Sequence, residues 1–323
     1  MRRIRPGWLW AGAALVLIAL GVRSDKPRTS APAASGHLEW GLYQILWSRS
    51  YAEELRREVA RFASRPNYVM FYRDLGRPFP RRAVDAIHEI GATPMVSLEL
   101  WRWHGGNKDS YLPAIVRGDY DAFLRDWACA ARTDGRRVLL RFGFEFNGNW
   151  FTWSLDPRGF VAAWRHAREI FRREKADNVE WVWSPNAANC PDTPDNDMHR
   201  YYPGDTHVDW LSLDGYNFGE HHDQWHHWQS FDEVFGKPLR EFEKRHPSKP
   251  VILSEFGCAS GKSRRRPQWI RDAHAALARY PQVRAAIWFN LDKRREGEPN
   301  WRLNVTAESL RAFNETFARP TPP

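Results

Sequence analysis

The chain has 323 residues, of which 42% are hydrophobic and 27% are charged, and its formal net charge is +9. This composition is that of a folded globular protein and excludes a largely disordered chain. The first 35 residues hold six of the bases and one of the acids, so the remainder carries an excess of only +4. Because that remainder also lacks a zinc-finger or RNA-recognition signature, we expect no nucleic-acid partner.

The first 36 residues differ in composition from the rest of the chain. Three arginines lie within residues 2–5, and residues 7–22 form an uncharged, mostly apolar run of 16 residues. This order is typical of an export signal, although a membrane-spanning helix usually needs about 20 residues. A signal peptide and an inner-membrane anchor both remain open for residues 1–23, and residues 24–36 have the composition of a linker. We expect the remainder to be exported, to the periplasm or the extracellular space, and to contact the membrane only through this N-terminal segment.

Beyond residue 36, short apolar runs alternate with amphipathic helical patterns. The runs predict strands at residues 38–46, 68–72, 93–98, 138–144, 179–183, 208–213, 251–254 and 283–289. The helical patterns cover residues 52–63, 81–90, 120–132, 157–173, 231–245, 268–278 and 307–317, with no clear helix between residues 184 and 207. Asp156 and Pro157 are expected to cap and begin the helix that follows the fourth strand.

Eight strands separated by helical segments predict one (β/α)8 barrel, a TIM barrel, over residues 37–319. A doubly wound open sheet is the competing architecture. That fold would need a glycine-rich phosphate turn after its first strand, and residues 44–48 offer none.

Functional side chains of such a barrel lie at the carboxyl ends of its strands. One of these ends carries a glutamate within an aromatic run, Glu145 in the stretch from Arg141 to Trp153. The flat tryptophan faces of such a run suit the apolar faces of sugar rings. The candidate residues at the strand ends are Glu99, Trp101, Arg141, Glu145, Asn147, Trp150, Trp153, Trp183, Asn186, Tyr216, Glu255 and Trp288.

Two of these candidates, Glu145 and Glu255, follow the fourth and seventh strands and are expected to face one another. Retaining glycoside hydrolysis uses two carboxyl groups roughly 5–5.5 Å apart, one as acid/base and one as nucleophile. Apolar neighbours raise the pKa of a carboxyl group, which suits Glu145 as the proton donor. Arg141 and the Tyr216 hydroxyl are expected to keep Glu255 ionised as the nucleophile.

The motifs at these positions resemble those of glycoside hydrolase family 26, retaining barrel enzymes that include β-mannanases, lichenases and β-1,3-xylanases. The family pattern Arg-x-x-His-Glu-Met-Asn-Gly-x-Trp is matched in part by residues 141–150, Arg-Phe-Gly-Phe-Glu-Phe-Asn-Gly-Asn-Trp. Further similar motifs occupy residues 181–186, 201–205, 208–210, 214–217, 254–257 and 288–290. The resemblance covers about residues 38–317.

The resemblance implies roles for individual residues. It makes Glu145 the acid/base and Glu255 the nucleophile, oriented by Tyr216. Trp288 would form the floor of the subsite for the attacked sugar, and Trp150 would border the leaving-group side. From their places at the strand ends, we expect Arg141, Asn147, Trp150, Tyr216 and Trp288 to support the two glutamates. We expect the cleft to be lined by Glu99, Trp101, Trp153, Trp183 and Asn186.

Two positions depart from the family pattern. Phe144 replaces the histidine before the acid/base, and Phe146 replaces the methionine after it. The family histidine reaches bound sugar, so Phe144 removes a polar contact of the kind that discriminates between sugars. A β-mannan and a mixed-linkage β-glucan therefore both remain candidate substrates.

The remaining signals predict no metal and no cofactor. Residues 221–228 are rich in histidine, but they lack the glutamate that zinc proteases place between paired histidines. Cys129, Cys190 and Cys258 have no metal-like spacing.

We expect a monomer that acts on a polysaccharide or oligosaccharide. The competing hypothesis is a non-catalytic barrel that binds polysaccharide or serves exopolysaccharide export. The missing histidine and a membrane anchor would favour that hypothesis, whereas the presence of both glutamates argues against it.

Overall fold

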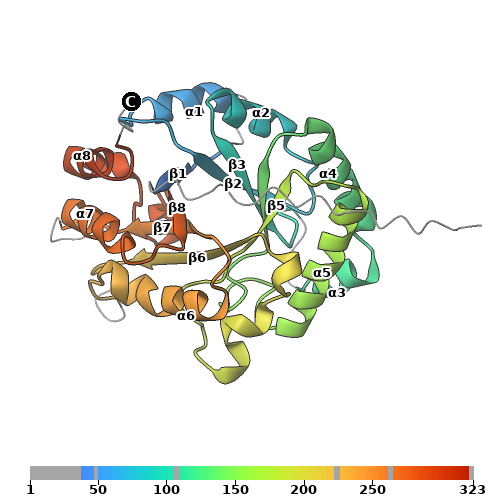
Figure 1. Cartoon of the computed structure of the whole chain (residues 1–323). Helices are drawn as coiled ribbons and strands as arrows, with labels where there is room; N and C mark the ends of the chain where they lie inside the picture. Colours follow the sequence, from blue (N-terminus) through green and yellow to red (C-terminus); the bar gives the residue numbers. More distant parts are fainter. Residues whose placement is uncertain (1–37, 47–49, 105–108, 222–225, 261–264, 320–323) are drawn as a thin grey trace, which may run out of the picture. The chain divides into compact units, whose positions relative to one another are not determined.

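The computed structural model describes residues 38–46, 50–104, 109–221, 226–260 and 265–319. Within it, parallel strands β1 to β8 follow one another around a closed barrel, and β8 pairs with β1 (Figure 1). The strands are β1 (Glu39–Tyr43), β2 (Tyr68–Asp74), β3 (Thr93–Glu99), β4 (Val138–Phe142), β5 (Val179–Trp183), β6 (Trp210–Asn217), β7 (Val251–Cys258) and β8 (Val283–Trp288). The predicted (β/α)8 barrel is confirmed. The expected leader and linker, residues 1–36, lie outside the described residues.

Helices surround the strands on the outside (Figure 1). They are α1 (Tyr51–Val59), α2 (Arg81–Glu89), α3 (Leu112–Arg117), α4 (Asp121–Asp134), α5 (Pro157–Arg173), α6 (Lys237–Arg245), α7 (Arg266–Leu277) and α8 (Ala307–Glu315). The short helix α3 was not predicted; it ends at Gly118, whose φ of 91° is left-handed. Between β5 and β6 the helical segments are three short 3-10 turns, at residues 194–196, 198–201 and 205–207.

The start of α5 follows the expected chemistry. The Asp156 side chain accepts a hydrogen bond from the backbone N–H of Gly159, and Pro157 occupies the first turn. None of the helices among the described residues is long and apolar enough to span a membrane.

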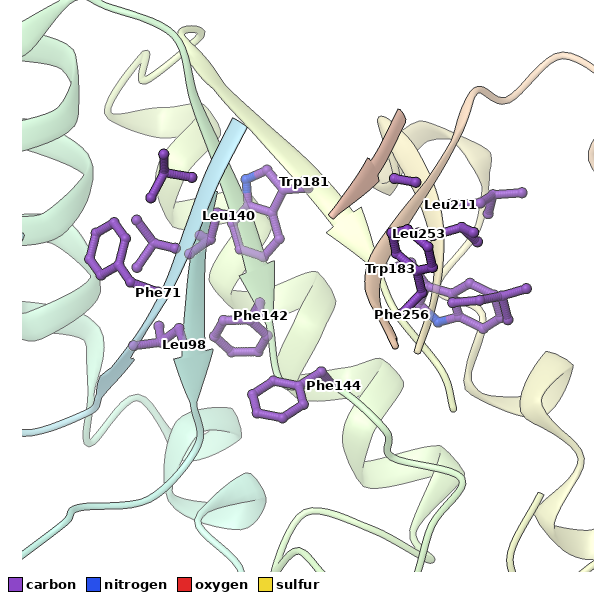
Figure 2. Close-up of a cluster of buried hydrophobic side chains, with 14 of the residues drawn as sticks. Phe71, Leu98, Leu140, Phe142, Phe144, Trp181, Trp183, Leu211, Leu253 and Phe256 are labelled. Atoms are coloured by element: carbon purple, nitrogen blue, oxygen red, sulfur yellow. The ribbon is translucent and has the colours of Figure 1, made fainter. Parts of the chain in front are cut away.

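Alternate strand residues face opposite sides of the barrel wall. Outward-facing Phe142 packs on Trp164 of α5, and outward-facing Trp183 packs on Phe242 of α6. Figure 2 shows Leu140 and Phe142 succeeding one another along β4, with Phe144 just beyond its end. The outer residues form the core between strands and helices, so the inner residues near the carboxyl ends are available for polar contacts.

The register of β7 changes just before its glutamate. Leu213 of β6 pairs with Leu253, but the next residue, Asp214, pairs with Glu255, so Ser254 is an extra residue. Pairing with β8 also shifts between Leu253 and Phe256. A β-bulge of this kind re-aims the residue beside it. Here it leaves Leu253 and Phe256 in the outer core and turns Glu255 toward the interior.

Candidate active site

Arg141 is the centre of the polar cluster inside the carboxyl end of the barrel. Its side chain is fully buried, and it donates from Nε to Ser184 Oγ (3.0 Å) and from Nη1 to Ser97 Oγ (3.2 Å). It also forms ion pairs with Asp214 and, at 2.5 Å, with Glu255 Oε1. Burial alone would lower the pKa of Arg141, but the two carboxylates more than offset it and raise the pKa above its usual value.

Glu255 is held by three donors. Besides Arg141, the Tyr72 hydroxyl donates to Oε1 at 2.6 Å and the Tyr216 hydroxyl donates to Oε2. Burial and the neighbouring Glu255 raise the pKa of both tyrosines well above the usual range, so both stay protonated donors. Donors of this kind favour the ionised carboxylate.

Glu145 lies in a different environment, just beyond the end of β4. Its backbone has a φ of 48°, which a residue other than glycine rarely adopts, and its N–H donates to the Ser184 carbonyl at 2.8 Å. Its side chain accepts a hydrogen bond from the indole nitrogen of Trp150 at 2.7 Å. Burial, followed by the charge of Glu255, raises the pKa of Glu145 to about 7. A carboxyl group in this state can donate a proton near neutral pH.

Phe144 packs directly on the guanidinium that holds Glu255. The Arg141 Cζ atom lies 4.2 Å from the centre of the Phe144 ring, and the Tyr72 and Phe151 rings lie beside it at 5.5 and 5.0 Å. Only 3% of Phe144 is exposed. The Phe144 ring, at the position where the family pattern has histidine, therefore forms an apolar surface between Arg141 and the aromatic residues after β4.

Glu99 adds a fourth carboxyl group at this end of the barrel, besides Asp214, Glu255 and Glu145. The indole nitrogen of Trp103 donates to it, and burial raises its pKa to about 7. Asp74 and Glu255 act on it electrostatically in the same direction. Trp101 is half-buried and packs edge-to-face on Phe151 and Trp153.

Asn147 and Trp153 are buried and support the loops around the cleft. Asn147 is buried: its amide nitrogen donates to the backbone oxygen of Asn186 (2.9 Å), and its side-chain oxygen accepts from the Asn186 N–H (2.8 Å). Trp153 is fully buried and donates from its indole to the Phe144 carbonyl at 2.8 Å. These hydrogen bonds fix the chain on both sides of Glu145. The exposed candidate is Trp150, 44% of whose surface is accessible.

Trp183 and Trp288 face away from the site and do not fit the expected roles as cleft lining and sugar platform. Both are fully buried. Trp183 donates to the Tyr201 carbonyl at 3.0 Å and packs against α6. Trp288 donates to the Trp301 carbonyl at 2.7 Å and packs against α7 and α8. Each is the last residue of its strand, and the alternation of side chains between the two faces of a strand directs it outward, toward the helices.

Three further residues, Tyr72, Tyr43 and Phe289, take part in the site without having been predicted, and Asp214 of the 214–217 motif joins them through its ion pair with Arg141. The Phe289 ring lies 5.0 Å from Tyr43 and 5.6 Å from Tyr216. Side chains alternate between the two faces of a strand, and Tyr72 and Phe289 each follow an outward-facing residue. The sequence could therefore have predicted that both face the interior of the barrel. Among the described residues, no group of three or more His, Cys, Asp or Glu side chains is arranged to hold a metal ion.

Comparisons with known proteins identify the family to which the chain is similar. Residues 118–238 match the model of Glycosyl hydrolase family 26. Endoglucanase H of Acetivibrio thermocellus is 32% identical over 246 residues, covering 73% of this chain and 25% of that protein. A mannan endo-1,4-beta-mannosidase A and B of Caldalkalibacillus mannanilyticus is 31% identical over 116 residues, covering 32% of this chain and 21% of that protein. The chain therefore spans about a quarter or less of the length of these curated relatives.

Solved structures share the fold. A GH26 β-mannanase from Bacteroides ovatus superposes with a TM-score of 0.63 at 20% identity, covering 88% of each chain. A modular endo-β-1,4-mannanase from Cellulomonas fimi gives 0.62 at 20% identity, covering 88% of this chain and 71% of that one. The match to the family model and the similarity to the curated relatives show that the chain belongs to glycoside hydrolase family 26.

Proposed function

We propose that the protein is a retaining glycoside hydrolase that cleaves a β-linked polysaccharide, with Glu145 as acid/base and Glu255 as nucleophile. The observation that carries this proposal is the contrast between the two carboxyl groups. Glu255 accepts from one guanidinium and two hydroxyls, whereas burial raises the pKa of Glu145 to about 7. One group is suited to attack and the other to donate a proton.

In the first step, a Glu255 oxygen attacks the anomeric carbon and the bond to the leaving sugar breaks. Glu145 transfers its proton to the departing glycosidic oxygen, which leaves a glycosyl ester on Glu255. In the second step, the ionised Glu145 takes a proton from water. The water oxygen attacks the anomeric carbon, Glu255 is released, and the product keeps the β configuration.

For the substrate, we propose a β-glucan ahead of a β-mannan. Support comes from Phe144, which puts an apolar ring where the family resemblance implies a sugar-contacting histidine. The broad match to an endoglucanase points the same way, because the match to the mannosidase covers less than half as much of this chain. A site that loses a hydrogen-bonding group loses discrimination for the sugar that used it.

The test is turnover on a panel of soluble polymers: mixed-linkage β-glucan, β-mannan and β-1,3-xylan. New reducing ends measure the rate, and proton NMR of the first products measures their anomeric configuration. We expect the highest kcat/KM on β-glucan and an initial β-anomer. An initial α-anomer would contradict the double-displacement mechanism.

The Glu255→Ala variant separates an enzyme from a non-catalytic binding protein. We expect it to bind the polymer in affinity electrophoresis without turning it over, whereas Glu243→Gln, an exposed change on α6, should behave as wild type. Binding by wild type and Glu255→Ala alike, with turnover by neither, would favour the non-catalytic alternative.

The Phe144→His variant tests the substrate assignment. We expect its ratio of kcat/KM on β-mannan to that on β-glucan to rise roughly tenfold, the size of effect typical of one additional hydrogen bond to the sugar. An unchanged ratio would remove Phe144 from the account of specificity.

We also propose that the protein acts outside the cytoplasm. This proposal is supported by the basic residues at positions 2–5 and the apolar run at 7–22. Cell fractionation of the full chain, with blotting for a C-terminal tag, would test it; a purely cytoplasmic signal would contradict it.

A further inference from the structure

A cavity of about 720 Å³ lies outside the barrel and is lined by residues of α1 and α2. Its lining includes Leu46 after β1, Arg73 on β2 and the loop that follows β2. Tyr72, the neighbour of Arg73, faces the opposite side of the strand and donates to Glu255. The cavity is therefore separated from the candidate active site by the barrel wall.

Five arginines line this cavity around two half-buried aromatic rings. The arginines are Arg56, Arg73, Arg77, Arg81 and Arg82, and the rings are Tyr51 and Phe79.

Arg73 is the buried member of the set. It is only 9% exposed and donates to two backbone carbonyls, those of Tyr72 (2.8 Å) and Leu46 (3.3 Å). No carboxylate among the described residues lies within ion-pair distance of it. Burial, followed by the charge of Arg77, lowers the pKa of Arg73 to about 10. A buried guanidinium normally has a carboxylate partner, because an uncompensated charge is costly to bury.

Arg77, Arg81 and Arg82 are weakly compensated. Arg77 Nε lies 3.5 Å from Asp74 Oδ1, and Arg81 Nη1 lies 3.9 Å from Asp134 Oδ2. Arg82 has no ion pair with the described part of the chain.

The acidic residues of the lining do not supply the missing charge. Glu89 pairs with Arg56 at 2.8 Å, and Asp85 pairs with Arg136. The cavity therefore retains a surplus of positive charge directed into an open space.

The placement of Arg81 and Arg82 increases that surplus. They are the first two residues of α2, whose first turn contains no acid. The N-terminus of a helix carries partial positive charge, so cations there are unfavourable and an anion is favourable. A local arrangement that opposes this rule is expected where a ligand compensates for it.

We propose that this cavity binds an acidic sugar residue, a uronic acid of a polysaccharide, through its carboxylate. Arginine forks bind carboxylates bidentately. A volume of about 720 Å³ is large for a free inorganic anion and fits the range of small-molecule sites, roughly 300–1,000 Å³. The rings of Tyr51 and Phe79 provide apolar surface for the sugar. Binding at this site does not depend on the proposed hydrolysis, since the cavity lies on another face of β2.

The test is isothermal titration calorimetry of the full-length chain with a trigalacturonate, in low and in moderate NaCl. Arg82→Gln and Arg77→Gln remove exposed guanidinium groups from the cavity, so both variants should fold. Arg57→Gln is the matched control: it removes an exposed arginine of α1 that does not line the cavity. Melting temperatures establish that each variant is folded.

We expect the wild type and Arg57→Gln to bind trigalacturonate equally, with affinity that falls as NaCl rises. Arg82→Gln and Arg77→Gln should each weaken binding about tenfold, as expected for loss of one charge-assisted hydrogen bond. Equal binding by the cavity variants and the wild type would overturn the proposal, as would no binding by the wild type.

Two further ligands test the chemical class. A neutral mannotriose should not bind at this site, and sulfate should bind far more weakly than trigalacturonate. If sulfate binds as tightly and displaces the trisaccharide, the site takes a small anion and the sugar assignment is wrong. If mannotriose binds with the same dependence on Arg82, the carboxylate is not recognised and the proposal also fails.

Discussion

Glu255 lies within β7 and Glu145 lies just beyond the end of β4, and they differ in the number of donors that surround them. The side chain of Glu255 accepts from Arg141, Tyr72 and Tyr216, whereas that of Glu145 accepts from Trp150. Burial, followed by the charge of Glu255, raises the pKa of Glu145 to about 7. These different surroundings are the basis for proposing different chemical roles for two identical side chains.

Removing each carboxylate in turn tests the two proposed roles most directly. We expect Glu255→Gln to lower kcat about 10⁴- to 10⁶-fold on any substrate, because the nucleophile is lost. Glu145→Gln should lose roughly 10²- to 10⁴-fold on the polysaccharide, as for a general acid. On an aryl glycoside whose phenol leaves without protonation, the first step of Glu145→Gln should be nearly normal.

The measurement for both variants is stopped-flow release of the phenol. A burst of phenol is expected from Glu145→Gln and none from Glu255→Gln. If Glu255→Gln gave the burst instead, the two roles would be exchanged.

The hydroxyl donors on Glu255 provide a second test of the contrast. Tyr72→Phe and Tyr216→Phe should each lower kcat/KM about 10- to 100-fold, since each removes a hydrogen bond to a charged group. Steady-state kinetics on the best polymer measures the loss. Tyr68→Phe is the matched control, because the Tyr68 hydroxyl donates to Glu39 and not to Glu255. A loss as large in the control would indicate a general effect on the barrel.

The single donor on Glu145 should control the pH range of activity. As Glu145 loses its proton above about pH 7, kcat/KM should fall with rising pH. The Trp150 hydrogen bond favours the ionised form, so Trp150→Phe should move this decline about 0.5–1 pH unit higher.

Glu99 requires its own control, because its pKa is also raised to about 7. A pH profile of Glu99→Gln that kept the decline would assign it to Glu145. A profile without the decline would assign it to Glu99 and contradict the proposed acid.

The raised pKa of Glu145 should also make the stability of the folded protein depend on pH, with a smaller effect than on activity. The folded-state pKa of Glu145 is raised from 4.5 to about 7, so between these values the folded state binds a proton that the unfolded state releases. The free energy of unfolding therefore falls as pH rises through this window. Glu145→Gln removes this contribution, and its melting temperature should decrease less between pH 5 and pH 8 than that of the wild type. Calorimetry at both pH values would show it, and an equal decrease would contradict the raised pKa.

Much of the fold was predictable from local patterns. The strand at 179–183 and the helix at 157–173 were predicted with their observed bounds. The other strands were placed with errors at their ends, as expected where pairing rather than side-chain pattern decides the last residues. The short helix at 112–117 was missed, because six residues give little periodicity.

The site was predicted less completely than the fold. Motifs placed Glu145, Glu255, Arg141 and Tyr216 at strand ends, and the structure brings them together around Arg141. Trp183 and Trp288 were also placed at strand ends, but the side of the wall that a residue faces depends on the exact count along its strand. Both face the helices.

The sequence by itself determined a barrel of eight strands and the two glutamates at its mouth, because apolar periodicity and residue type are local properties. Tertiary structure alone decided the surroundings of each glutamate. The extra residue at Ser254 turns Glu255 inward, and Tyr72, 183 residues earlier in the chain, donates to it. Such hydrogen bonds depend on barrel closure and register, which join distant segments and leave no signal in any single stretch of sequence.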